Sequence, residues 1–220
     1  MTTLNVIYAD AALVVLNKPS GLLAVPGKTS DECLSLQVQA QFADALIVHR
    51  LDMSTSGLMV MARGVAAQRM LNAHFAERRV HKRYVAVAHG DCRAEAETGA
   101  DEGWHTIDLP IIVDWPNRPL RKIDFDTGKP SSTRWRCVAY DAVRHASRLE
   151  LEPLTGRSHQ LRVHLQAIGH SILGDALYAT PDVAAASARL LLHASELAFA
   201  HPASGEWISF QCPDGFEPQA

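Results

Sequence analysis

The chain has 220 residues, 47% of them hydrophobic, and a formal net charge of −3, which is typical of a folded globular protein. It contains no apolar run approaching the ~20 residues of a membrane-spanning helix and no basic and apolar leader of the kind found in signal peptides. Its four cysteines are far apart and form no Cys-x-x-Cys pair, which argues against a zinc site and a disulfide framework. We therefore expect a cytoplasmic protein.

The first forty residues predict two strands, a loop and a helix. Residues 6–8 and 13–16 read as a short strand pair, and a loop punctuated by Pro and Gly follows over residues 19–27. Residues 29–32 have the composition of a capping box. They predict a helix that begins after this box and ends near Phe42.

The next elements alternate between strand and helix. Leu58 to Ala62 is an unbroken apolar run, as in a strand buried on both faces. Residues 64–78 carry apolar side chains four apart and predict an amphipathic helix. Residues 82–88 predict a strand. The segment 90–106 is acidic, and we interpret it as a surface insertion, whereas the Pro-rich residues 104–119 read as an irregular loop.

The C-terminal half predicts two further strand pairs around one helix. Residues 135–140 and 148–151 alternate like antiparallel strands. Ser158 is placed to cap a helix that ends near Ile168, and residues 190–212 read as a closing hairpin. Strands outnumber helices and are mostly joined locally, so we predict an α+β fold with a mixed, mostly antiparallel sheet flanked by helices. We expect residues 1–220 to form a single domain.

The most informative segment precedes the apolar run at Leu58. Its sequence is His49-Arg50-Leu51-Asp52-Met53-Ser54-Thr55-Ser56-Gly57. The segment places Asp52 at the mouth of a core strand, where burial tunes a carboxylate. An aspartate followed by Ser, Thr and Gly also makes an ordinary capped turn, and for Asp52 taken alone that interpretation is the better one.

The whole nine-residue segment resembles the active-site sequence of RluA-type pseudouridine synthases, His-Arg-Leu-Asp-x-x-Thr-Ser-Gly. Further segments resemble that family in the family's order. They are Asn17 to Leu22, Lys82 to Ala86, Leu154 to His164, Gly174-Asp175, and Leu190 to Ala194. Residues 114–119 and 127–130 are most similar to members with a dual substrate range, an rRNA stem-loop and the anticodon stem-loop of some tRNAs. The resemblance implies the pseudouridine synthase catalytic fold, with an active-site cleft across the sheet.

The same resemblance implies roles for three residues. Pseudouridine formation moves the ribose bond from uracil N1 to C5 and requires no redox cofactor or group donor, so we expect no cofactor. Asp52 matches the catalytic aspartate, which must be ionised whether it acts as a nucleophile or as a base. Arg162 matches the arginine that pairs with this aspartate, and a nearby guanidinium lowers a carboxylate pKa. Tyr84 matches the active-site tyrosine. Taken alone, Arg162 reads as a surface residue and Tyr84 as a core tyrosine.

RNA is the expected partner, from 23S rRNA, tRNA or both. The net charge is weakly acidic, but basic residues cluster at 78–83 and 118–122, and phosphate contacts supply much of the affinity of RNA-binding proteins. The candidate RNA contacts are Arg50, Arg157, His159, Arg79, Lys82 and Arg83. Each also has a plainer interpretation, because basic runs usually form a solvated surface, and Arg157 and His159 could instead order the loop around Asp52.

The histidines suggest no metal site, because no His-x-x-x-His pair occurs. We expect a monomer without a separate N-terminal RNA-binding domain. Two other functions are open to the sequence. One is a non-catalytic RNA-binding protein on the same scaffold, for which Asp52, Tyr84 and Arg162 would have no chemical use. The other is a glycoside or nucleoside hydrolase, which needs a second carboxylate that no motif supplies.

Overall fold

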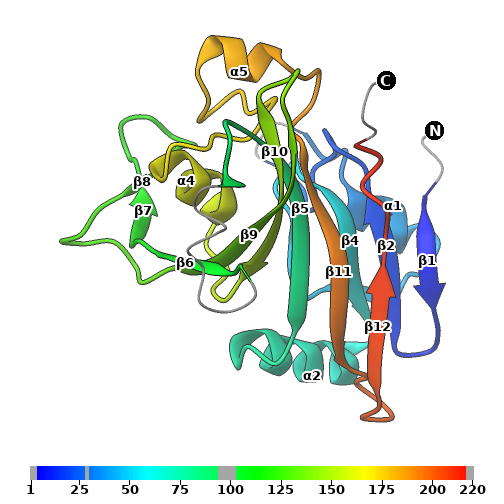
Figure 1. Cartoon of the computed structure of the whole chain (residues 1–220). Coiled ribbons are helices and arrows are strands. Elements are labelled where there is room, and N and C mark those ends of the chain that lie inside the picture. Colours follow the sequence, from blue (N-terminus) through cyan, green and yellow to red (C-terminus); the bar gives the residue numbers. More distant parts are fainter. Residues whose placement is uncertain (1–3, 28–29, 94–102, 217–220) are drawn as a thin grey trace. The chain divides into compact units, whose positions relative to one another are not determined.

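The computed structural model describes residues 4–27, 30–93 and 103–216 (Figure 1). Two compact units are distinguished along the chain, one formed by Met1–Lys82 with His193–Ala220 and the other by Arg83–Leu192. Asp52 therefore belongs to the first unit, whereas Tyr84 and Arg162 belong to the second. That residues 1–220 act as one domain stays a prediction.

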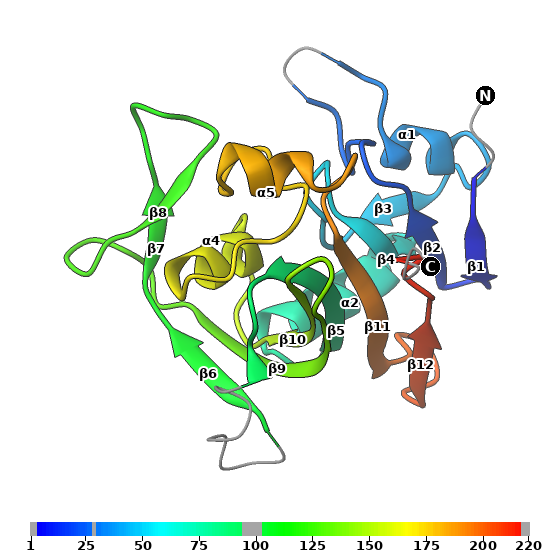
Figure 2. The same cartoon turned by 45° about the horizontal axis from the view of Figure 1, so that its top comes forward.

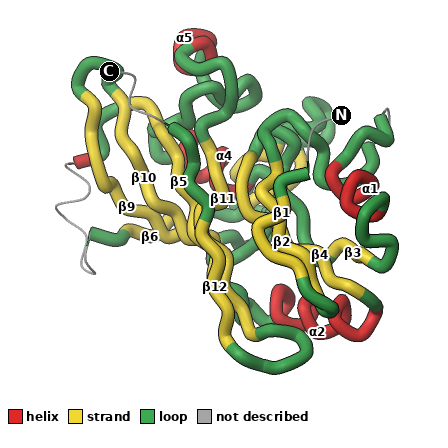
Figure 3. Tube along the Cα trace, turned by 90° about the vertical axis from the view of Figure 1, so that its right-hand side faces the viewer, coloured by secondary structure: helices red, strands yellow, loops and turns green. Residues whose placement is uncertain are grey.

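Strands form the centre of the first unit. Their order is β1-β2-β4-β11, with β3 beside β4 and β12 beside β11 (Figure 3). Neighbouring strands are antiparallel except β4 and β11, which run parallel. The elements are β1 (Val6–Ala9), β2 (Leu13–Lys18), α1 (Leu34–Gln39), β3 (Ala45–Ile47), β4 (Ser56–Arg63), α2 (Val65–Ala76), β11 (Leu192–Ala200) and β12 (Trp207–Gln211).

The core of the first unit follows the apolar pattern of its sequence. Every residue of β4 from Ser56 to Ala62 is buried, which confirms the strand predicted to be covered on both faces. Helix α2 packs on β4 and buries Ala67 and Leu71 on one side, as the four-residue spacing predicts. The strand pairs β1–β2 and β11–β12 are also confirmed.

The second unit contains an antiparallel sheet in the order β5-β10-β9-β6 and a separate β7–β8 hairpin. Helix α4 lies beside this hairpin (Figure 2). The elements are β5 (His81–His89), β6 (His105–Asp108), β7 (Ile111–Val113), β8 (Arg121–Ile123), β9 (Ser132–Asp141), β10 (Ala146–Pro153), α4 (Gln160–Ala167) and α5 (Pro181–Ala185). Few helices and mostly antiparallel strands confirm the predicted α+β class.

Of the capping box predicted at residues 29–32, Thr29 lies outside the described residues. Cys33 occupies the N-cap position and makes no side-chain cap bond. The first helical N–H groups are satisfied by backbone instead, because Leu34 and Ser35 donate to the carbonyls of Leu23 and Ala24 at 2.8 and 3.1 Å. An N-terminal loop folded back in this way replaces the side-chain cap. The helix is also shorter than predicted.

The stretch 104–119, predicted to be irregular, contains two strands. His105–Asp108 forms β6, which pairs with β9, and Ile111–Val113 forms β7, which pairs with β8. Ile107 and Ile111 are buried, so pairing with distant strands overrides the local Pro-rich composition. Of the predicted acidic insertion, residues 94–102 lie outside the described part of the chain.

Candidate active site

The backbone presents Asp52 on a turn just before strand β4. The N–H of Thr55 donates to the carbonyl of Asp52 at 3.1 Å. Leu51 and Thr55 are buried, with 6% and 3% of their surface exposed, and Asp52 between them is half-buried. The turn interpretation and the active-site interpretation are therefore compatible, because the turn is what holds Asp52 in place.

The segment Asn17 to Leu22, which contains Lys18-Pro19-Ser20-Gly21, anchors the N-terminal side of this turn. Lys18 is completely buried, and its ammonium donates to the carbonyls of Pro19 and Leu22 at 2.8 Å and of Met53 at 3.0 Å. The Met53 carbonyl also accepts from the N–H of Gly21 at 2.9 Å. Buried charges persist only when they are hydrogen-bonded in this way. The residue next to Asp52 is thus fixed by its backbone.

Strand β11 anchors the C-terminal side. The hydroxyl of Ser56 lies 2.8 Å from Nδ1 of His193, and Nε2 of His193 lies 3.2 Å from the carbonyl of Cys212. A carbonyl only accepts, so Nε2 carries the proton and Nδ1 accepts from Ser56. Gly57 faces Ala194 across the parallel strand pair. A matched Leu-His-Ala segment therefore holds the start of β4.

The residues before Asp52 differ in environment. His49 accepts a hydrogen bond from the N–H of Val60 at 3.0 Å, and its ring stacks on Phe75. Burial and the positive charge of Lys82 lower the pKa of His49 to about 3, so it is neutral at pH 7. Arg50 is exposed, as a residue that contacts RNA must be.

Tyr84 lies on strand β5 of the second unit, opposite Leu151 of β10. It is half-buried, whereas Ala86 and Ala88, which share its face of the strand, are fully buried. This confirms the predicted strand, which is buried on both faces from Val85 to Ala88. The role of Tyr84 stays a prediction.

Arg162 is buried in helix α4, with 4% of its surface exposed, and is held by Asp175. Its Nε and one terminal nitrogen donate to the two carboxylate oxygens of Asp175 at 2.8 and 2.5 Å, and its guanidinium lies 5.0 Å from the centre of the Tyr178 ring. The plain surface interpretation of Arg162 is therefore wrong. Pairing with Asp52 stays a prediction, and the sequence assigned no role to Asp175 although it lies in a matched Gly-Asp segment.

Helix α4 does not begin as predicted. His159, not Ser158, occupies its N-cap position, in a left-handed conformation with φ of 59° and without a side-chain cap bond. Nδ1 of His159 lies 2.6 Å from the hydroxyl of Tyr178. Arg157 is exposed, and one of its terminal nitrogens lies 3.5 Å from the carbonyl of Pro130. Both predicted roles of Arg157 and His159, phosphate contact and loop ordering, stay open.

The basic cluster at residues 78–83 is divided between solvent and ion pairs. Arg79 is exposed and pairs with Glu77. Arg83 pairs with Glu152 at 2.8 Å and lies over the ring of Trp104. Burial and the nearby Arg78 lower the pKa of Lys82 to about 8. The RNA contacts proposed for Arg79, Lys82 and Arg83 stay a prediction.

The loop between β7 and β8 carries an aromatic and basic surface. The sequence predicted only a loop and a cluster of basic residues there. Trp115 is 63% exposed, and the guanidinium of Arg118 lies 4.6 Å from the centre of its ring. Lys122 follows on β8 with more than half of its side chain exposed. An exposed aromatic ring beside basic side chains is a common surface for stacking bases. The Trp-Pro-Asn-Arg-Pro sequence was the available signal.

Within residues 4–27, 30–93 and 103–216, no helix is long and apolar enough to cross a membrane. The same residues contain no group of three or more His, Cys, Asp or Glu side chains that could hold a metal ion.

Comparison with known proteins decides the family. Residues 12–167 match the family model described as RNA pseudouridylate synthase. The chain belongs to this family. This pseudouridine synthase is 46% identical over 215 residues to "Dual-specificity RNA pseudouridine synthase RluA" of Escherichia coli strain K12, which covers 97% of this chain and 94% of that relative. Its identity to the protein of the same name from Yersinia pestis is 45% over 213 residues, covering 96% and 99% of the two chains.

A solved structure agrees with this assignment. The human RNA pseudouridylate synthase domain containing 1 is 30% identical, with a TM-score of 0.78, and the match covers 98% of this pseudouridine synthase and 85% of that chain. The family, the enzyme class and the fold predicted from sequence are therefore confirmed. RNA as the class of substrate follows from the family.

Proposed function

We propose that this enzyme isomerises uridine to pseudouridine in structured RNA, in a 23S rRNA stem-loop and in the anticodon stem-loop of some tRNAs. The similarity to relatives named dual-specificity synthases supports two classes of RNA substrate. The observation that carries the proposal is the Asp52 turn, whose backbone is anchored on one side by Lys18 and on the other through Ser56. Such anchoring holds a carboxylate in one position, which catalysis requires.

In this proposal Asp52 supplies the reacting carboxylate. The reaction breaks the bond between uracil N1 and the ribose C1′, turns the ring, forms a bond from C5 to C1′, releases the C5 proton to water and adds a proton from water at N1. No net atom is gained from a co-substrate. Asp52 acts either by attacking the substrate or by removing a sugar proton, and both roles need the ionised form. Arg162 keeps its charge at all working pH values and favours that form.

The target uridine must leave its base stack to meet Asp52. Flipping a base costs a few kcal/mol, and the protein must supply this from contacts with the RNA. Tyr84 offers a ring for stacking on the flipped uracil. Arg50, exposed on the turn two residues before Asp52, fills the vacated space or holds phosphate. The remaining proposed contacts are Arg79, Lys82, Arg83, Arg157 and His159. We propose that the protein acts as a cytoplasmic monomer.

A tritium-release assay tests the proposal. RNA labelled at uracil C5 loses tritium to water when pseudouridine forms, while the RNA chain stays intact. We expect wild-type protein to release tritium and Asp52→Asn to release none, with RNA affinity and unfolding temperature nearly unchanged. A near-normal rate for Asp52→Asn removes Asp52 from the mechanism. Binding without release by wild-type protein supports the non-catalytic RNA-binding alternative, and free uracil as product supports a hydrolase.

A further inference from the structure

Hydrogen bonds within its own loop hold the carboxylate of Asp175, in addition to its ion pair with Arg162. Asp175 is 1% exposed. Its Oδ1 accepts hydrogen bonds from the N–H groups of Leu177 and Tyr178 at 2.9 and 3.1 Å. Its own N–H donates to the carbonyl of Ile172 at 3.2 Å. The carboxylate is therefore oriented by its own loop and cannot turn without losing these bonds.

Gly174 permits the position of this loop. Its φ is +76°, and a Cβ built on it would lie 1.9 Å from the carbonyl oxygen of Arg189. Backbone cannot move aside as the end of a flexible side chain can. Only glycine allows the chain to pass Arg189 so closely and then place Asp175. Gly174 is therefore required for the loop that positions Asp175.

The guanidinium of Arg162 is bound by the Asp175 carboxylate along one edge, and the ring of Tyr178 packs on its face. The two hydrogen bonds from Asp175 are bidentate, the strongest and most directional arrangement of this ion pair. Tyr178 lies 5.0 Å from the guanidinium carbon. Because a guanidinium is planar and carries five N–H donors, fixing the Nε edge also fixes the direction of the remaining donors.

We infer that Asp175 is a positioning residue for catalysis: it holds the guanidinium of Arg162, the proposed partner of the catalytic carboxylate, in one orientation. This inference rests on the proposed function and on the proposed pairing of Arg162 with Asp52. Asp175 acts only through Arg162 and touches no substrate. Asp175 lies beyond the segment 12–167 that matches the family model, and the sequence alone gave it no role.

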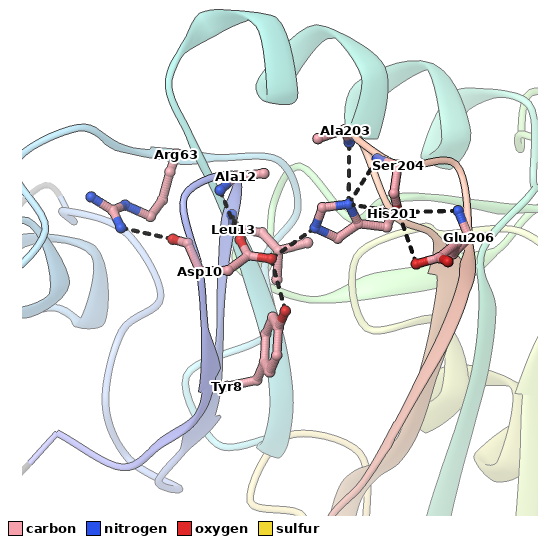
Figure 4. A network of polar contacts seen from close by, with 9 residues as sticks. All are labelled: Tyr8, Asp10, Ala12, Leu13, Arg63, His201, Ala203, Ser204 and Glu206. Atoms are coloured by element: carbon pink, nitrogen blue, oxygen red, sulfur yellow. Dashed lines mark hydrogen bonds and ion pairs between the residues drawn. The ribbon is translucent and has the colours of Figure 1, made fainter.

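The chain offers a matched control in Asp10 (Figure 4). Asp10 likewise accepts the N–H groups of the residues two and three positions later, Ala12 and Leu13, at 2.7 and 2.9 Å. It also accepts from Tyr8 and lies 2.8 Å from Nε2 of His201. Strand β4 runs from Ser56, near the Asp52 turn, to Arg63, which donates to the Asp10 carbonyl. Asp10→Asn therefore removes a comparable carboxylate at the far end of β4.

The experiment compares Asp175→Asn with Asp10→Asn in single-turnover tritium release, RNA affinity and thermal unfolding. Both variants should unfold at lower temperature. Only Asp175→Asn should lose rate, by about 100-fold, as small misplacements of catalytic groups do, with RNA affinity within about twofold of wild type. A wild-type rate for folded Asp175→Asn overturns the inference. If Asp175→Asn does not fold, Asp175→Glu keeps the charge and shifts the guanidinium, and an undiminished rate for it has the same consequence.

A double variant separates positioning from a general structural role. In an Arg162→Gln background, Asp175→Asn should cause no further loss of rate, because the residue through which it acts is already gone. An equal loss in both backgrounds would show that Asp175 acts by another route and would overturn the inference. Asp52→Asn in the same series tests the proposed function itself. An active Asp52→Asn variant removes Asp52 from the mechanism, and wild-type protein that releases no tritium refutes the proposed function, whereas a slow Asp52→Asn with a fast Asp175→Asn refutes only the role of Asp175.

Discussion

Replacing Gly57 with alanine should separate strands β4 and β11. Gly57 has a φ of +113°, and an added Cβ would lie 2.4 Å from the oxygen and 2.5 Å from the nitrogen of Ala194. Ordinary contact begins near 3.4 Å, so the two backbones would have to move apart by about 1 Å. Hydrogen bonds weaken steeply at such a displacement. The substitution therefore perturbs the strand that starts just after the Asp52 turn.

The free-energy cost has two parts. A positive φ costs a residue with a side chain about 1–2 kcal/mol, and each buried backbone hydrogen bond left unmade costs about 1–3 kcal/mol. With one such bond lost, Gly57→Ala should lower the free energy of unfolding by about 2–5 kcal/mol, which corresponds to a fall in unfolding temperature of roughly 10 °C for a chain of this size. The rate of tritium release should fall as well, because the turn before Gly57 carries Asp52.

Gly64→Ala is the control for this prediction. Gly64 also has a positive φ, of +79°, but no atom lies within 4 Å of its added Cβ. Gly64→Ala should therefore lower the free energy of unfolding only through its positive φ, by about 1–2 kcal/mol. Unfolding in urea, with the slope of the transition compared between variants, measures both. If Gly57→Ala is no more destabilising than Gly64→Ala, the close approach to Ala194 does not control the stability of this strand pair.

Four further outcomes are expected. Arg162→Lys should lose far more tritium-release rate than RNA affinity, because an ammonium cannot reproduce the bidentate fork; equal losses would mean that Arg162 merely holds RNA. RNA affinity should fall between pH 7.5 and 9 as Lys82, with its pKa of about 8, loses its charge, and Lys82→Arg should remove this dependence in filter binding. Trp115→Ala should weaken RNA binding by about 1–3 kcal/mol without changing the unfolding temperature. Tyr178→Phe, which keeps the ring over Arg162 but loses the bond from the N–H of Arg121 and the contact with Nδ1 of His159, should retain most of the single-turnover rate.

Local periodicity predicted the elements whose apolar residues form a clear pattern within the element itself. The apolar run at Leu58 became a fully buried strand, and the four-residue spacing around Leu71 became helix α2. The hairpin β9–β10 followed from alternation along both strands. In each case the pattern records which side of the element is covered. The type of such an element can therefore be predicted from its own sequence, without knowing which distant segment covers it.

The features that the sequence did not predict depend on distant backbone. Helix α1 takes its cap from the carbonyls of Leu23 and Ala24, and β6 exists because it pairs with β9. The partner of Arg162 was likewise hidden, because Asp175 reaches it only after the chain has left helix α4 and turned at Gly174. The spacing between Arg162 and Asp175 in the sequence does not show that the chain folds back and brings them together. A matched motif can identify both residues, but it does not explain their contact.

The Asp52 turn shows why motif residues far apart in sequence act together. Lys18, Gly21 and Ser20 all donate to carbonyls of residues 53 and 54. Replacing Lys18 by a neutral residue would remove the ammonium that donates to the carbonyls of Pro19, Leu22 and Met53, at about 1–3 kcal/mol for each acceptor left unpaired.

Because these bonds end on backbone carbonyls, the position of the turn does not depend on the charge of the Asp52 side chain. Exchanging one carboxylate oxygen of Asp52 for an amide nitrogen leaves every one of these anchors in place. A loss of rate in Asp52→Asn without a loss of folding would therefore report on the chemistry of the carboxylate itself, and a variant that unfolds would show that the charge also holds the turn.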